Sequence, residues 1–91
     1  MRASVKLSWP LVVVTWWDAN STTGWVAGEK LPPLALIVTC GWLVRQSKKS
    51  LTLAASIATD MEEGEFGESI TIPRGCVERM QTLMRGRTNA L

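Results

Sequence analysis

The chain contains no histidine, the side chain that most often transfers protons near neutral pH. Its absence excludes Ser-His-Asp and Cys-His catalytic sets and imidazole metal ligands. The two cysteines, Cys40 and Cys76, form no C-x-x-C motif, so neither a zinc site nor a redox motif is predicted. We expect both to be buried free thiols in a reducing cytoplasm. A non-enzymatic protein without metal or cofactor is therefore expected.

Long apolar runs are also missing. The longest uncharged stretch, 31–44, has 14 residues and contains two prolines and a glycine, whereas a membrane-spanning helix needs about 20 apolar residues. Arg2 and Lys6 precede an apolar segment, as in a signal peptide, but Pro10 interrupts it and no small-residue cleavage site follows. We expect an intracellular protein with no membrane partner.

The charge is divided unevenly along the 91 residues, a length that predicts one domain, 1–91. Ten basic and eight acidic residues leave a net charge of +2, yet segment 60–68 has five acids and no base. This predicts an acidic loop, which disfavours general nucleic-acid binding because phosphate contacts need uninterrupted basic surface. Acids crowded into one loop also do not face each other across a cleft, as carboxylate catalysis requires. The five acids are Asp60, Glu62, Glu63, Glu65 and Glu68.

Alternating apolar residues between turn signals predict five short strands. The segment 76–83 is ambiguous, because Val77, Met80 and Met84 also have helical spacing; the short connection before it favours a strand. That connection, Pro73-Arg74-Gly75, predicts a tight turn or a single 3₁₀ turn. Segment 25–30 is either a short strand or an extended arm. The expected strands are 11–17, 34–45, 51–59, 68–72 and 76–83.

The pattern is typical of a mostly β fold, a small, curved, five-stranded barrel of the SH3-like or Sm-like kind. The long strand 34–45 is expected in the core, with Gly41 at a bend or bulge and Trp42 on the inward face. Ile70 and Ile72 are also expected to point inward. Residues 1–6 and 85–91 are expected to be frayed.

Five tryptophans accompany a single phenylalanine. Trp16 and Trp17 are adjacent on a predicted strand and must point to opposite faces, so one needs a surface other than the core. That surface is either a subunit interface or a ligand, and we expect a homo-oligomer.

A polar loop follows this pair and offers hydroxyls, an amide, a carboxylate and an indole, which suit a ribose or a purine edge. Alternatively, the loop bonds only to itself. Arg74, on its Pro-Arg-Gly turn, is the strongest anion-binding candidate, whereas Lys48 and Lys49 are read as solvated. The candidate ligand-binding residues are Trp16, Asp18, Ser21, Thr22, Thr23, Trp25 and Arg74.

Four segments, WWDANSTTGW, VTCGWLV, LTLAASIATD and ITIPRGCVERMQTL, follow each other between Val12 and Leu83. In this order they resemble a group of small, largely uncharacterised proteins of tailed bacteriophages, with W-x-D-A, G-W, T-x-G-W-L and I-P-R-G-C elements. The resemblance implies a phage origin, a compact β fold and a place in the host cytoplasm. Phages also use small oligomeric proteins as sponges for nucleotide signals of host immunity.

By analogy with those sponges, we expect a phage anti-defence protein that sequesters a nucleotide-derived signal in an oligomer. The signal would be a cyclic dinucleotide or a cyclic ADP-ribose compound. Two alternatives stay open: a small β-barrel nucleic-acid-binding module, and a protein-interaction or inhibitor protein.

Overall fold

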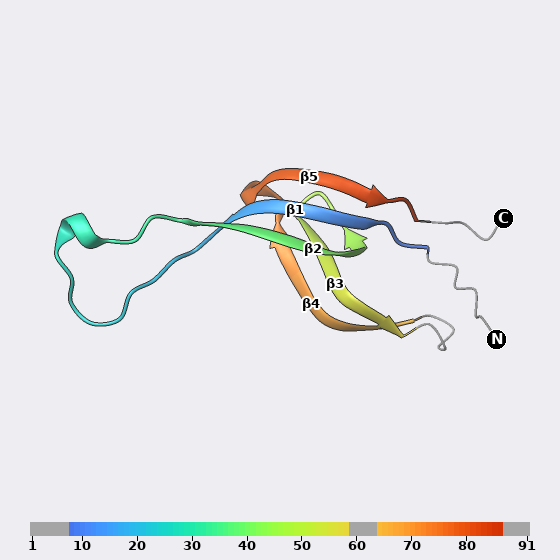
Figure 1. Ribbon diagram of the computed structural model, residues 1–91, viewed down its shortest axis with the longest axis horizontal. Helices are drawn as coiled ribbons and strands as arrows, with labels where there is room; N and C mark the ends of the chain where they lie inside the picture. The colour runs from blue at the N-terminus through green and yellow to red at the C-terminus, as the bar shows by residue number, and fades with distance from the viewer. Residues whose placement is uncertain (1–7, 59–63, 87–91) are drawn as a thin grey trace.

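The computed structural model describes residues 8–58 and 64–86, which form one antiparallel sheet of five strands (Figure 1). The predicted mostly β class is confirmed. Within these residues the only helical segments are two 3₁₀ turns, and none could cross a membrane. The elements are β1 (Leu11–Asp18), η1 (Gly28–Lys30), β2 (Ala35–Gln46), β3 (Ser50–Ala58), β4 (Glu65–Pro73), η2 (Arg74–Cys76) and β5 (Val77–Met84).

β1 is a central strand because it pairs with β2 on one side and with β5 on the other. Its run of β-branched and aromatic residues suits a strand with neighbours on both sides. Val12, Val14 and Trp16 are buried and alternate with residues of the outer face. The ambiguous C-terminal segment is thus a strand, and the turn before it is the predicted 3₁₀ turn.

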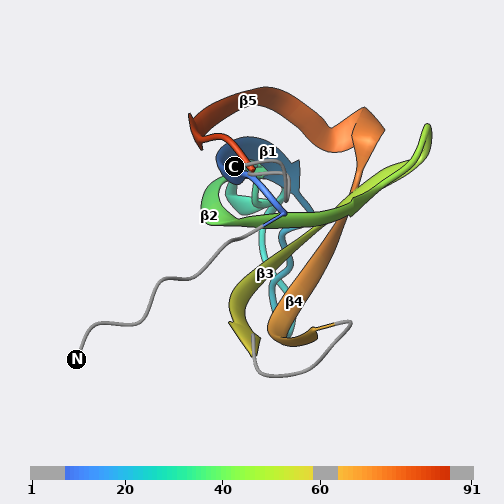
Figure 2. The same ribbon diagram turned by 90° about the vertical axis from the view of Figure 1, so that its right-hand side faces the viewer.

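β2 bends where it changes partners. Its first part, from Ala35 to Trp42, pairs with β1, and its last part, from Trp42 to Gln46, pairs with β3, with a register shift at Val44. At the bend, a Cβ on Gly41 would lie 3.0 Å from the Ala54 carbonyl oxygen. The bend lets β3 and β4 swing away from β1 and β5, so that the sheet curls around its buried face (Figure 2). A bend or bulge was expected at Gly41; the register shift lies three residues later, at Val44, while Gly41 is the point of closest approach to β3.

The core lies inside this curl and draws on four strands. Pro10 extends the β1–β2 pairing by accepting a hydrogen bond from the Leu43 amide at 2.9 Å. Outside the core, Trp9 packs edge-on against Phe66, with ring centroids 5.2 Å apart. The buried cluster is Val12, Val14, Trp16, Leu43, Leu51, Leu53 and Ile72.

The faces of β2 are the reverse of the expected ones. Its inward face carries Gly41 and Leu43, whereas Trp42 belongs to the outer face and is half-buried. Leu36 and Val38, on that outer face, are 52% and 66% exposed. Both faces of this strand are apolar, so hydrophobic alternation could not determine which one is buried. The expectation of a strand enclosed in the core is wrong for its outer face.

Three smaller expectations also change. β4 begins at Glu65, so Glu65 and Glu68 belong to a strand, while 60–63 lie outside the described residues. Cys40 is exposed and Cys76 half-buried, so neither free thiol is fully buried. Ile72 is in the core, but Ile70 on the edge strand is exposed. The two terminal segments expected to be frayed are 1–6 and 85–91; all of the first and residues 87–91 of the second lie outside the described residues.

The two edges of the sheet are β4 and β5, which the single turn η2 connects. No pairing joins these strands within the described part of the chain, so the sheet is curved and open. The observed architecture is therefore five antiparallel strands in one curled sheet.

The hydrogen bond between Trp16 and Thr39 provides a test of the core. The Trp16 indole nitrogen donates to the Thr39 hydroxyl at 2.9 Å. Thr39→Val keeps the shape but leaves a buried N–H without its acceptor, which should lower the free energy of unfolding by about 1–2 kcal/mol. Urea denaturation would measure it. Thr15→Val, on the outer face of β1, is the matched control; an equal loss in both variants would contradict the assigned role.

Candidate functional site

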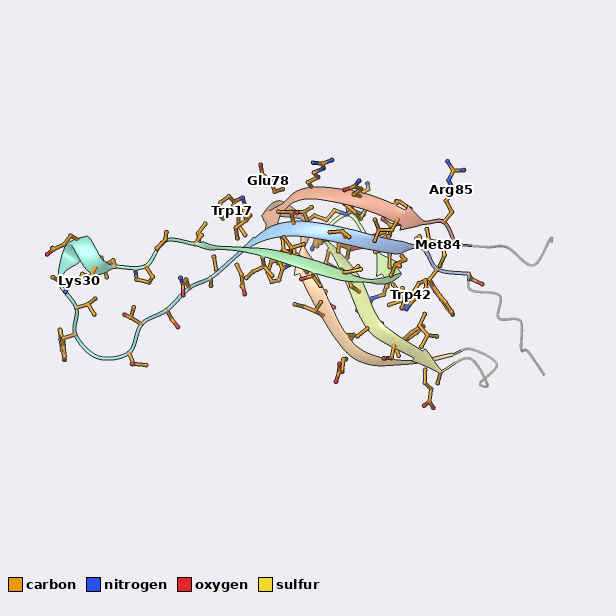
Figure 3. All side chains as sticks on the ribbon, viewed as in Figure 1. Trp17, Lys30, Trp42, Glu78, Met84 and Arg85 are labelled. Atoms are coloured by element: carbon orange, nitrogen blue, oxygen red, sulfur yellow. The ribbon has the colours of Figure 1, made fainter. Side chains whose placement is uncertain are left out.

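The two adjacent tryptophans divide between core and surface, as predicted. Trp16 is 6% exposed and belongs to the core, whereas Trp17 is 38% exposed. The Trp17 indole nitrogen donates to Glu78 Oε2 at 2.9 Å, which holds the ring beside β5 (Figure 3). The indole available at the surface is thus Trp17, although the sequence singled out Trp16. The signal that could have separated them is Thr15, the polar residue on the same face as Trp17.

The polar loop after β1 is the first leg of an arm that projects from the sheet (Figure 1). At its base, Asp18 Oδ1 accepts a hydrogen bond from the Ala19 amide at 2.8 Å, and Asn20 Oδ1 accepts from the Ser21 amide at 3.0 Å. Each of these two bonds joins neighbouring residues, so both are local. Ser21, Thr22, Thr23 and Trp25 are all exposed along the arm.

Arg74 is fixed to the β2–β3 turn. Its amide donates to the Lys49 carbonyl at 2.8 Å, its Nε donates to the Ser47 carbonyl at 2.6 Å, and its Nη2 donates to Gln46 Oε1 at 2.7 Å. The Nε–Nη2 edge, one of the two guanidinium edges that can hold a phosphate with two parallel hydrogen bonds, is therefore occupied. The same bonds connect Arg74 to the turn that contains Lys48 and Lys49, so these three cations form one group, the cationic turn.

An open cleft of about 560 Å³ lies between the base of the arm and η2. This volume falls within the range of about 300–1,000 Å³ that small-molecule sites occupy. Arg74 immediately precedes its lining residue Gly75, so the cleft adjoins the cationic turn along the chain. The residues lining this basal cleft are Trp17, Ala19, Leu34, Gly75 and Cys76.

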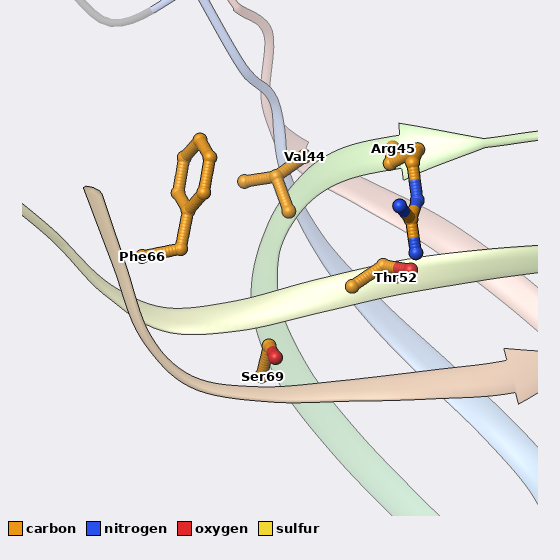
Figure 4. A pocket seen from close by; sticks show the side chains of 5 residues that line it. All are labelled: Val44, Arg45, Thr52, Phe66 and Ser69. Atoms are coloured by element: carbon orange, nitrogen blue, oxygen red, sulfur yellow. The ribbon is translucent and has the colours of Figure 1, made fainter. Parts of the chain in front are cut away.

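A second hollow lies beside β2, β3 and β4 (Figure 4). Val44, Arg45, Thr52, Phe66 and Ser69 line it. Its volume of about 240 Å³ is below the usual range for small-molecule sites. The Thr52 hydroxyl is also already hydrogen-bonded to the Thr71 hydroxyl, at 2.8 Å. A third hollow, of about 370 Å³, lies at the far ends of β3 and β4. The basal cleft is the better candidate for a ligand.

The basal cleft combines apolar walls with charge nearby. Its walls are mostly apolar, Glu78 is already hydrogen-bonded to Trp17, and the cations lie on the adjoining turn. Within 8–58 and 64–86, no three Cys, Asp or Glu side chains gather to hold a metal ion. An apolar wall beside positive charge suits a flat ring that carries a phosphate.

The structure thus divides the sequence-predicted site among several places. Asp18 lies at the base of the arm, Ser21 to Trp25 lie along it, and Arg74 points to the β2–β3 turn. Leu34, Gly75 and Cys76 line the cleft but were not among the predicted residues. They meet only through the fold, and no local sequence signal identifies them. Neither the protein-family models, nor the curated proteins, nor the solved structures that were searched contain a match to this chain.

Proposed function

We propose that this chain is a non-enzymatic binding protein that captures a nucleotide-derived signalling molecule, of the cyclic dinucleotide or cyclic ADP-ribose type. The observation that carries this proposal is the basal cleft beside the cationic turn. The Trp17 ring offers a flat apolar surface for a base, and positive charge follows within one residue of the cleft. A ligand that combines an aromatic ring with phosphate matches both features.

The biological setting belongs to the same proposal. The four sequence segments that resemble tailed-bacteriophage proteins support a phage anti-defence role, in which the protein acts as an oligomeric sponge in the host cytoplasm. The SH3-like or Sm-like barrel is the architecture we propose for it. The strong bend of β2 and the single turn between the two edge strands support that architecture.

General nucleic-acid binding is the weaker alternative. Lys48, Lys49 and Arg74 gather at one turn, whereas Glu65 and Glu68 line the adjoining edge strand. A duplex or a long single strand requires a continuous basic track, which these carboxylates interrupt.

Affinity measurements on turn variants test the proposed ligand. Arg74→Ala removes both a cation and the bonds that hold the turn, so affinity for the captured nucleotide should fall about ten- to a hundredfold. Lys48→Ala/Lys49→Ala should change affinity less than about threefold, because exposed lysines stay hydrated. Calorimetry with cyclic dinucleotides and cyclic ADP-ribose compounds would measure both.

Arg85→Ala is the control, since this cation lies near the other end of β5, away from Glu78 and Trp17 (Figure 3). Each variant's melting temperature must be compared with that of the unmodified protein, because Arg74 also orders the turn. If Lys48→Ala/Lys49→Ala lowers nucleotide affinity more than Arg74→Ala does, the phosphate binds at the tip of the turn and not at Arg74. If no nucleotide binds the unmodified protein, the protein-interaction function takes precedence, which the exposed arm favours.

A further inference from the structure

The arm, residues 19–34, projects from the sheet and contacts little of the rest of the chain. Every residue from Trp17 to Leu31 is exposed, and Trp25 has 103% of its reference surface accessible. The arm lies along the longest axis of the molecule, which measures 60 Å against 23 and 22 Å for the other two (Figure 1). Its tip is the turn η1, with Lys30 at the far end from the sheet (Figure 3).

Within a single chain, the entropy cost of fixing the backbone of this arm is not offset by burial of its apolar side chains. Holding each residue in one backbone conformation costs about 1–2 kcal/mol, and the compensation normally comes from buried apolar surface. Here the apolar side chains of the arm, Trp25, Val26, Leu31 and Leu34, are all exposed. An exposed tryptophan with apolar neighbours is typical of the centre of a protein interface.

The base of the arm has a matching apolar surface. The basal cleft, with Trp17 and Leu34 in its lining, continues into Leu36 and Val38 on the outer face of β2. Trp17 pairs with Leu36, and Thr15 pairs with Val38, in the β1–β2 register. We call this continuous surface the basal stripe. No charged residue occurs between Leu31 and Val44.

The geometry points to a second copy of this chain as the occupant of the basal stripe. Two arms placed antiparallel about a two-fold axis bring each tip to the base of the other arm. Trp25 of one copy then covers the partner's basal cleft, opposite the partner's Trp17. This isologous arrangement satisfies both arms by the same contacts and closes at two subunits.

The charged residues at the tip and base of the arm, and its exposed apolar side chains, are both consistent with a second copy of the chain at this surface. The tip carries Glu29 and Lys30, and the base carries Asp18, with Arg79 beside Thr15 in the β1–β5 register. In the antiparallel arrangement Lys30 meets the partner's Asp18, and Glu29 meets the partner's Arg79. Arm and stripe together expose seven large apolar side chains, Trp17, Trp25, Val26, Leu31, Leu34, Leu36 and Val38, which supply apolar surface for such an interface.

This inference rests on the proposed function in one respect, because the partner's Trp25 forms the second wall of the ligand cleft. The dimer itself forms without ligand. Sedimentation of the unliganded full chain at tens of micromolar should therefore show a dimer, and Trp25→Ser should weaken it at least tenfold. Leu83→Ser, on β5, is the matched control, because it also removes an exposed apolar side chain and should leave the dimer unchanged.

A charge exchange tests the antiparallel register. Lys30→Asp alone and Asp18→Lys alone each place like charges at both contacts, so each homodimer should dissociate about tenfold more readily. Mixing the two variants restores both opposite-charge contacts between different copies, and the mixture should return to within about threefold of the unmodified dimer.

A monomeric unmodified protein, or a dimer that Trp25→Ser does not weaken, would overturn the inference. If the mixture of Lys30→Asp and Asp18→Lys proteins dimerises no more tightly than either variant alone, the antiparallel register is wrong. Nucleotide affinity is measured separately by calorimetry. If the unmodified protein forms a dimer that Trp25→Ser weakens but binds no nucleotide, the proposed function is rejected and the dimer is not.

Discussion

Trp16→Ala is expected to lower the free energy of unfolding by about 3–5 kcal/mol, the usual cost of truncating a large buried aromatic side chain. Trp16 is nearly inaccessible, packs in the core, and directs its indole nitrogen to Thr39. A chain of this size has a total stability of only about 5–15 kcal/mol. Urea denaturation followed by circular dichroism would measure the loss, and a substantial unfolded fraction without denaturant is the extreme outcome.

Trp17→Ala is the matched control, because it removes the same side chain from the next position of the same strand. Trp17 is partly exposed, and its single hydrogen bond to Glu78 is at the surface, so its loss should cost less than about 1 kcal/mol. The same variant should weaken nucleotide binding, since Trp17 lines the basal cleft. Equal destabilisation by both substitutions would show that the two faces of β1 are not distinguished as described.

Gly41→Ala is expected to destabilise the fold by about 2–3 kcal/mol, although alanine is otherwise a mild replacement. A Cβ at this position would lie 3.0 Å from the Ala54 carbonyl oxygen and 3.2 Å from Leu53 Cβ. Both neighbours belong to buried residues of β3, so they cannot move aside without disturbing the core. Chemical denaturation would report the change in the free energy of unfolding.

Gly67→Ala is the control, because it also replaces a glycine within a strand but at a position where a Cβ is not crowded. At Gly67 a Cβ would lie 3.6 Å from Ser56 Cβ, an ordinary contact. Alanine there should be neutral or should stabilise by up to about 1 kcal/mol, because it reduces the freedom of the unfolded chain. A destabilisation by Gly67→Ala as large as that by Gly41→Ala would argue against close approach at the β2 bend.

Residues 11–17 illustrate what was predictable, because their β-branched and aromatic side chains favour a strand wherever they are placed. The β2–β3 turn is similar, since Ser47 Oγ accepts hydrogen bonds from the Lys49 and Ser50 amides, both at 3.2 Å. At Pro73-Arg74-Gly75 a tight turn or a single 3₁₀ turn was expected, and a 3₁₀ turn is found at Arg74–Cys76. In each case the structure depends on interactions within a few residues of the chain.

The candidate site was much less predictable. Its apolar walls come from residues near 17 and 34 on one side and near 75 on the other, and only the pairing of β1 with both β2 and β5 brings them together. The sequence predicted Arg74 as a cation on a turn, but its bonds to Gln46 and Ser47 connect positions 28 and 27 residues apart. No pattern in one sequence reports such contacts.

By itself, the sequence determined the class of the fold, the approximate places of the five strands and the turns between them, because local propensity and side-chain alternation act over short distances. The tertiary structure alone decided which face of β2 is buried. Alternate residues of a strand point to opposite faces, and both faces of β2 are largely apolar. The choice therefore depends on how distant strands curl around one another, which also leaves the arm and the basal stripe exposed.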